Sequence, residues 1–178
     1  MHAIGPRVNV FFTHLMTMTF VLVAIGSSFS YMQLRKSSPI VDLRMSEMSF
    51  LRQLQREKCD QAYIKFDLDA DFRKMWSWNI NHMYVYVVAE YQSSTHTRNE
   101  VVVWDSILSG RQDALIARKG QYNKYSLKDH GYGLRNTPVT LKFKYNILPY
   151  MGPLFYGEEG QTSFNVPANY TSRSVSFA

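Results

Sequence analysis

Cysteine is almost absent from this sequence of 178 residues, in which Cys59 is the single copy. A lone cysteine excludes a disulfide within the chain and any zinc site that uses two thiolates. It does not decide the compartment, because a cytosolic domain and a lumenal domain with a large enough core can both do without disulfides.

Charge is missing from one long segment, residues 8–32, which contains no Asp, Glu, Lys or Arg. As a helix rising about 1.5 Å per residue, this segment is about 37 Å long, more than the roughly 30 Å of a bilayer's hydrocarbon core. Arg7 precedes it, and Arg35 and Lys36 follow it. Basic residues at the ends of a membrane-spanning helix commonly extend their charged groups to the lipid headgroups. The sequence therefore predicts a membrane-spanning helix over residues 8–32.

Two other interpretations of this segment stay open. Ala24 and Gly26 place small residues where a signal peptidase would cleave, which is typical of a removable signal peptide and would release a secreted or cell-surface binding module. A buried helix of a soluble protein is the third interpretation, although such helices rarely run this long without charge. Among the polar residues inside the segment are His14, Thr13, Thr17 and Thr19. They are expected to bond the helix backbone or a neighbouring helix, and a proton-relay role is the alternative.

The rest of the chain has the period of two that is typical of β-strands. Apolar and polar residues alternate over 62–72 and 139–147, whereas 83–91 and 101–108 are apolar on both faces. Shorter strands are expected at 40–50, 115–118, 122–127 and 161–166, and a short helix at 50–58. Many short strands separated by turn residues indicate an antiparallel β-sandwich, formed as one domain by residues 33–178.

The formal charge of +6 favours anionic neighbours such as lipid headgroups, or only a solvated basic surface. Nucleic acid is not expected as a partner, because no RRM, KH or zinc-finger signature accompanies the basic residues.

No catalytic, cofactor-binding or metal site is predicted. The spacing Asp67-x-Asp69-x-Asp71 begins like a calcium loop, but Phe72 and Trp78 stand where an EF-hand needs Gly and Glu. Three carboxylates on one strand face are instead expected to pair with Lys or Arg on neighbouring strands. No Gly-x-Ser-x-Gly motif occurs, although spacing leaves open a Ser–His or Cys–His pair assembled from distant positions.

Two apolar connections are candidate contact surfaces. The turn-rich segment 149–157 and the connection around residues 76–78 either fold back over the core or face a partner or the bilayer. Their candidate contact residues are Trp76, Trp78, Tyr150, Met151, Leu154 and Phe155. Separately, Asn169-Tyr-Thr is an acceptor sequence for N-glycosylation.

An ordered series of short motifs resembles the family of signal peptidase complex subunit 3, the 22/23 kDa subunit of the eukaryotic endoplasmic reticulum enzyme. The series consists of Phe66-Asp-Leu-x-Ala-Asp71, Trp78-Asn-Ile80, Tyr86 to Tyr91, Val101-Val-Val-Trp-Asp-x-Ile107, Leu141 to Gly152, and Val166-Pro167. It covers roughly residues 60–167, behind an N-terminal anchor as in the family.

The resemblance implies a single-pass type II protein of the endoplasmic reticulum membrane. Residues 1–7 would be a cytosolic tail, 8–32 the signal-anchor and 33–178 the lumenal domain. It implies a non-catalytic role, supporting a catalytic serine-protease subunit beside the other subunits of the complex while signal peptides are removed from nascent secretory and membrane proteins. Many members carry an Asn-x-Thr acceptor before the late strand; Pro138 interrupts it here and leaves Asn169 as the candidate.

The charges that flank the helix favour the opposite orientation. Arg7 and the α-amino group stand against Arg35, Lys36 and Arg44, so the positive-inside rule favours a cytosolic C-terminal domain. The lumenal assignment therefore depends on the resemblance.

Overall fold

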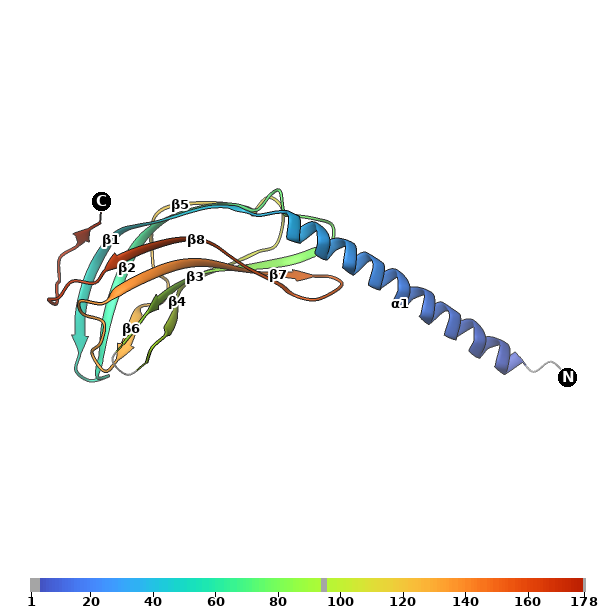
Figure 1. The fold of residues 1–178 in the computed structure, drawn as a ribbon, viewed down its shortest axis with the longest axis horizontal. Helices are drawn as coiled ribbons and strands as arrows, with labels where there is room; N and C mark the ends of the chain where they lie inside the picture. Colours follow the sequence, from blue (N-terminus) through green and yellow to red (C-terminus); the bar gives the residue numbers. More distant parts are fainter. Residues whose placement is uncertain (1–3, 94–95, 178) are drawn as a thin grey trace.

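The structure is a computed structural model that describes residues 4–93 and 96–177. One long helix leads into a mainly β domain whose two antiparallel sheets pack face to face (Figure 1). The elements within the described residues are α1 (Ile4–Lys36), β1 (Ile40–Leu54), β2 (Cys59–Asp71), β3 (Ile80–Tyr91), β4 (Asn99–Leu108), β5 (Leu115–Tyr122), β6 (Leu127–His130), β7 (Pro138–Pro149), β8 (Phe155–Asn165) and β9 (Val175–Ser176). The predicted β-sandwich behind one apolar helix is confirmed.

Helix α1 projects from one end of the sandwich, and the C-terminus lies at the opposite end (Figure 1). The 33 residues of α1 make a rod about 50 Å long at roughly 1.5 Å per residue. It is apolar and long enough to cross a membrane, and its most apolar window has no residue buried against the domain. The expected span of residues 8–32 lies wholly inside it.

Several polar side chains of α1 bond the helix itself. Thr13, Thr17 and Thr19 donate to the carbonyl oxygens four residues earlier, and His14 Nδ1 contacts the carbonyl of Val10 at 2.8 Å. Such bonds remove the cost of placing a hydroxyl in hydrocarbon, because the group already has its partner. The expectation of bonds to the helix backbone is confirmed.

The two sheets are built from antiparallel neighbours. The first has the order β5-β2-β1-β9, with β6 also pairing with β2, and the second has the order β4-β3-β7-β8. The β1–β2 register runs from Ile40 opposite Asp71 to Leu54 opposite Cys59. The start of β1, the end of β2 and the beginning of β5 therefore share the end of the sandwich from which α1 leaves.

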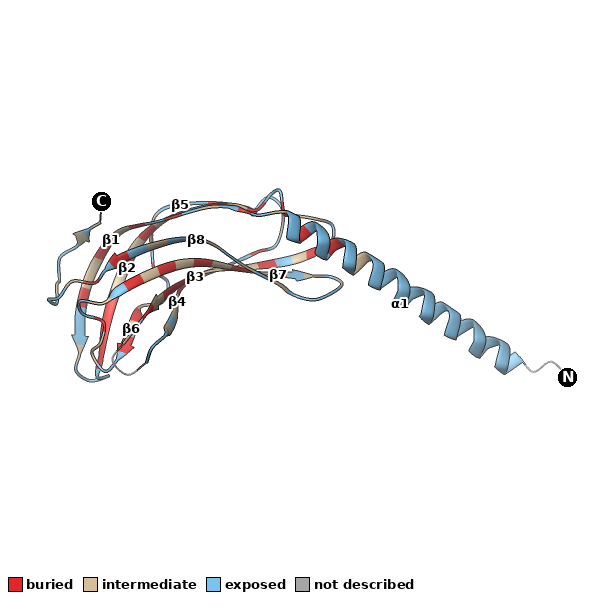
Figure 2. Ribbon diagram, viewed as in Figure 1, coloured by how far each residue is buried: buried red, intermediate tan, exposed pale blue. Residues whose placement is uncertain are grey.

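The core lies between the sheets and takes side chains from both, and Figure 2 shows buried residues recurring along their strands. Phe66, Phe72 and Phe143 are fully buried, and the ring of Phe72 lies 5.9 Å from that of Phe143 in the opposite sheet. The alternation of the sequence directs one face of each strand here, as period two requires. Cys59 is also buried, as a free thiol.

The predicted helix over residues 50–58 is wrong. Strand β1 continues to Leu54, and the ring of Phe50 stacks on its cross-strand partner Tyr63 with centroids 4.8 Å apart. A β-bulge between Met48 and Phe50 changes the side-chain alternation, so that Phe50 and Leu51 imitate the spacing of a helix face.

The predicted strand over residues 122–127 is also wrong. Strand β5 ends at Tyr122 and β6 begins at Leu127. Between them Asn123 is buried and accepts a hydrogen bond from Ile64 N at 3.1 Å, which fixes a turn in place of a ladder.

The carboxylates of Asp67, Asp69 and Asp71 do not form the expected cross-strand set. Asp71 pairs with Arg73, two residues later, at 2.7 Å, and Asp67 accepts from the backbone N–H of Gly120. The Arg73 contacts lower the pKa of Asp71 from 3.8 to about 2. No group of three or more metal-binding side chains is found among residues 4–93 and 96–177.

Candidate interaction surface at the helix–domain junction

The last third of α1 packs on the sandwich through one face. Gly26, Ser30 and Leu34 are spaced by four residues and so line the same side of the helix. Ser30 and Leu34 are buried, while Gly26 and Ser27 are partly covered. The small side chains allow close approach: a Cβ on Gly26 would lie 3.7 Å from the Trp78 ring.

Asn79 joins the two apolar connections that meet this helix face. Its side chain is 1% exposed, donates from Nδ2 to Met151 O at 2.8 Å and accepts from Met151 N at 3.0 Å. The backbone oxygen of Asn79 accepts from Tyr150 N at 2.8 Å. One buried amide thus fixes the loop 149–154 against the 76–79 connection.

Gly152 brings that loop onto the helix. Its φ is +106°, which favours glycine, and an added Cβ would lie 2.2 Å from Ser27 Oγ. The void that Ser30, Asn79 and Met151 help to line between helix and loop has a volume of about 10 Å³. That space holds one water at most, so the junction is closely packed.

The candidate contact residues gather around this junction, but with different exposure. Trp76 and Phe155 pack against the core, and Phe155 also meets Tyr31 of α1 edge-on at 6.1 Å. Trp78, Tyr150 and Leu154 stay exposed, at 61%, 67% and 48%. Met151 lies half-buried between loop and helix.

Three junction residues were not predicted as site residues from the sequence: Asn79, Ser27 and Gly152. Asn79 binds a residue 72 positions away, and no local pattern reveals that contact. The spacing of small residues at Gly26 and Ser30 is the one sequence signal that could have indicated a packed helix face.

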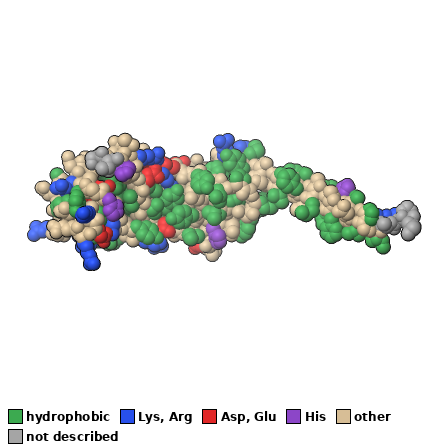
Figure 3. Space-filling view, turned by 90° about the horizontal axis from the view of Figure 1, so that it is seen from below, with side chains coloured by type: hydrophobic (Ala, Val, Ile, Leu, Met, Phe, Trp, Pro, Cys, Tyr) green, Lys and Arg blue, Asp and Glu red, His purple; other side chains and the backbone are tan. Residues whose placement is uncertain are grey.

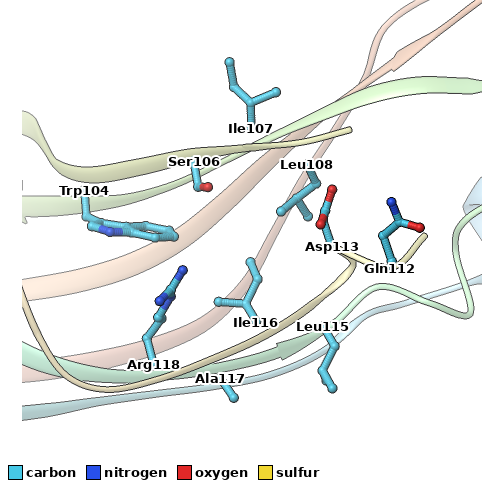
Figure 4. A pocket seen from close by; sticks show the side chains of 10 residues that line it. All are labelled: Trp104, Ser106, Ile107, Leu108, Gln112, Asp113, Leu115, Ile116, Ala117 and Arg118. Carbon is cyan, nitrogen blue, oxygen red and sulfur yellow. The ribbon is translucent and has the colours of Figure 1, made fainter. Parts of the chain in front are cut away.

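A second open surface lies between the edge strands β4 and β5 (Figure 4). The cleft has a volume of about 430 Å³; Trp104 from β4 and Arg118 from β5 both line it. Lys124 N and Tyr125 N donate to the β4 edge at Val103 O, at 2.8 and 3.0 Å. Edge strands of this kind can accept an extended segment of another chain.

Charged residues on the outer face of the second sheet are paired with one another. Lys142 contacts Glu90 at 2.8 Å and Glu158 at 3.3 Å, and Lys144 contacts Glu100 at 3.2 Å. The Lys142 bond holds the pKa of Glu90 below its usual value. This face therefore offers no concentrated positive charge of the kind that nucleic acid requires.

Comparison with known proteins gives one consistent result. The family model described as "Signal peptidase subunit" matches residues 1–169. "Signal peptidase complex subunit 3" of Dictyostelium discoideum is 33% identical over an alignment covering 73% of this chain and 75% of the relative. The protein of the same name from Yarrowia lipolytica is 28% identical over 93% of this chain and 97% of the relative. The one from Schizosaccharomyces pombe is 30% identical over 90% of this chain and 91% of the relative.

Proposed function

This chain belongs to the signal peptidase subunit family, and from that premise we propose its role within the complex. It is a membrane-anchored, non-catalytic subunit. It supports the catalytic serine-protease subunit in cleaving signal peptides from nascent secretory and membrane proteins during translocation into the endoplasmic reticulum.

The observation that carries the proposal is the packed junction between α1 and the sandwich. A domain on a free linker would leave its distance from the bilayer undefined. Here Gly152 contacts Ser27 of the helix, and Asn79 binds the same loop through two hydrogen bonds. A partner bound to the sandwich is then held at a fixed height above the membrane, where its active site must meet an emerging signal peptide.

An aromatic surface on the second sheet supports a protein partner. Tyr84 and Tyr86 stack on the outer face of β3 with centroids 5.1 Å apart, and Ile107 of β4 is 63% exposed beside them. Aromatic side chains are enriched at protein interfaces, and here two half-buried tyrosines lie beside an exposed isoleucine. The partner is tested by co-purification in a mild detergent: the proposal requires a serine-protease membrane subunit, and its absence would contradict it.

We place residues 1–7 in the cytosol, 8–32 in the membrane and 33–178 in the lumen. Family membership supports this orientation against the weak charge signal. The substitution Pro138→Thr tests it by restoring an acceptor at Asn136, which is exposed. A lumenal domain gains one glycan that Asn136→Gln removes; no gain would contradict the orientation.

We further infer that the chain has no active site of its own, and hydrolysis of a signal peptide by the purified chain alone would refute this.

The alternative of a secreted binding module needs cleavage at Gly26. The structure disfavours it, since Gly26 lies inside a continuous helix and under Trp78. The intact mass of the mature protein separates the two: loss of residues 1–26 would establish the alternative.

A further inference from the structure

The end of the sandwich next to α1 is made of segments that lack charge. Besides residues 8–32 of the helix, residues 75–89 and 145–157 contain no Asp, Glu, Lys or Arg, in a chain that is 19% charged. The loops 76–79 and 149–154 within them, called here the tip, touch the helix beside the Phe155–Tyr31 contact. On the face seen in Figure 3, hydrophobic side chains gather over the domain towards α1 and continue along it.

The contact between tip and helix fixes the depth of the tip. A hydrocarbon core of about 30 Å takes about 20 helical residues. Counted from Val8, the part of the 8–32 segment that crosses hydrocarbon ends near Ser27, and residues 28–32 then lie in the headgroup layer. Gly26 and Ser27 are the residues that Trp78 and Gly152 approach. The tip therefore lies at the level where hydrocarbon gives way to headgroups.

The exposed side chains of the tip suit that level. Trp and Tyr prefer the membrane–water interface, where a ring can be buried while its polar atom stays wet. Trp78 and Tyr150 are the two most exposed aromatic side chains of the tip, and Leu154 adds an aliphatic side chain to the same surface. In water this cluster would leave apolar area exposed without a partner.

Exposed basic residues surround the tip. The hydrogen bond from Phe72 N to Ala114 O brings the loops after β2 and after β4 to the same end of the sandwich. Those loops and the end of α1 carry Arg35, Lys36, Arg73, Lys74 and Arg111, all exposed. Arg73 is paired with Asp71, and Asp113 is exposed in the loop of Arg111, so basic side chains remain in excess at this end. Basic side chains around an uncharged patch match the phosphate layer of a bilayer.

We propose that the tip is a second membrane contact, in which Trp78, Tyr150 and Leu154 enter the interfacial layer of the phospholipid bilayer. The sandwich is then held by lipid at its base as well as by the helix, which limits its tilt. The inference depends on the membrane anchorage in the proposed function but not on any protein partner.

Site-directed spin labelling tests the proposal on the full chain in phosphatidylcholine vesicles without other subunits. Single cysteines replace Trp78, Tyr150 or Leu154 in a Cys59→Ala background, and collision with dissolved oxygen is compared with collision with a water-soluble nickel chelate. Tyr122→Cys, on the partly exposed β5, and Gln55→Cys, in the turn at the opposite end, are the aqueous controls. Phe20→Cys, in the middle of α1, is the control within the membrane.

The tip labels should collide with the nickel chelate several-fold less than the Tyr122 and Gln55 labels. This protection should disappear in lipid-free amphipol. Equal access of tip and control labels in vesicles would overturn the proposal, as would protection that persists without lipid. A Phe20 label open to the nickel chelate would overturn the anchorage itself, and the tip contact with it.

A second measurement avoids new cysteines. In the variant Trp76→Phe/Trp104→Phe, the remaining Trp78 should be quenched strongly by lipids brominated near the headgroup. Quenching no greater than that of a soluble tryptophan would overturn the proposal.

Discussion

Replacing Gly152 by alanine should loosen the helix–domain junction, and Gly131→Ala is its matched control. The two glycines have φ of +106° and +104°, so alanine carries a comparable backbone cost at both positions, roughly 1–3 kcal/mol. At Gly152 the added Cβ would also lie 2.2 Å from Ser27 Oγ, whereas at Gly131 it meets nothing within 4 Å. Overpacking of this kind costs about 1–3 kcal/mol, which sets the expected difference between the variants.

The assay is thermal unfolding in detergent, followed by the β-sheet circular dichroism signal. A difference of about 1–3 kcal/mol corresponds to about 2–12 °C for a chain of this length. Ser27→Ala removes the clashing hydroxyl, so the double variant Ser27→Ala/Gly152→Ala should recover part of the loss, with a coupling of about 0.5–3 kcal/mol. Equal midpoints for Gly152→Ala and Gly131→Ala, or no coupling, would refute the junction as described.

Two further predictions concern single polar groups. Asn79→Ala removes both hydrogen bonds to Met151 and leaves the backbone N–H and C=O of Met151 unpaired. The free energy of unfolding, measured by chemical denaturation, should fall by about 2–5 kcal/mol. Replacement of the exposed Asn165 by alanine is the control and should change it little. Asp71→Asn should lower the stability only at pH values where the Asp71 carboxyl is charged. The folded pKa of about 2 lies below the ordinary 3.8. The Arg73 contact therefore stabilises the fold fully above about pH 4, and this stabilisation is lost as the pH falls through 2. Melting curves should therefore show wild type and Asp71→Asn converging as the pH falls from about 4 towards 2, and a gap at pH 2 as large as the gap near neutral pH would contradict this cause.

The sequence predicted the elements whose pattern is local. The missing charge over residues 8–32 identified the long helix. Alternation identified β2 and β7, and runs that are apolar on both faces identified β3 and β4, each to within three residues at either end. The two wrong predictions, a helix over residues 50–58 and a strand over residues 122–127, followed a local pattern that contacts elsewhere in the fold outweigh. A β-bulge gave Phe50 the spacing of a helix face, and burial of Asn123 replaced a strand by a turn.

The junction could be predicted only in part. Apolar, turn-rich composition singled out Trp78 and Tyr150 as contact candidates, yet nothing local showed that both lie beside the same helix face. That placement depends on Asn79 and Gly152, whose partners are 72 and 125 positions away in the sequence. Contacts of this kind become visible only when the fold brings the segments together.

Signal-peptide processing in cells tests the central claim most directly, that the helix holds the sandwich in the position the complex needs. Cells depleted of the endogenous subunit would express wild type, Gly131→Ala, Gly152→Ala or Ser27→Ala/Gly152→Ala, and the uncleaved fraction of a secretory precursor would be measured. The account predicts normal cleavage with wild type and Gly131→Ala, accumulated precursor with Gly152→Ala, and recovery with the double variant. Normal cleavage with a Gly152→Ala chain whose junction is shown to be loosened would contradict it.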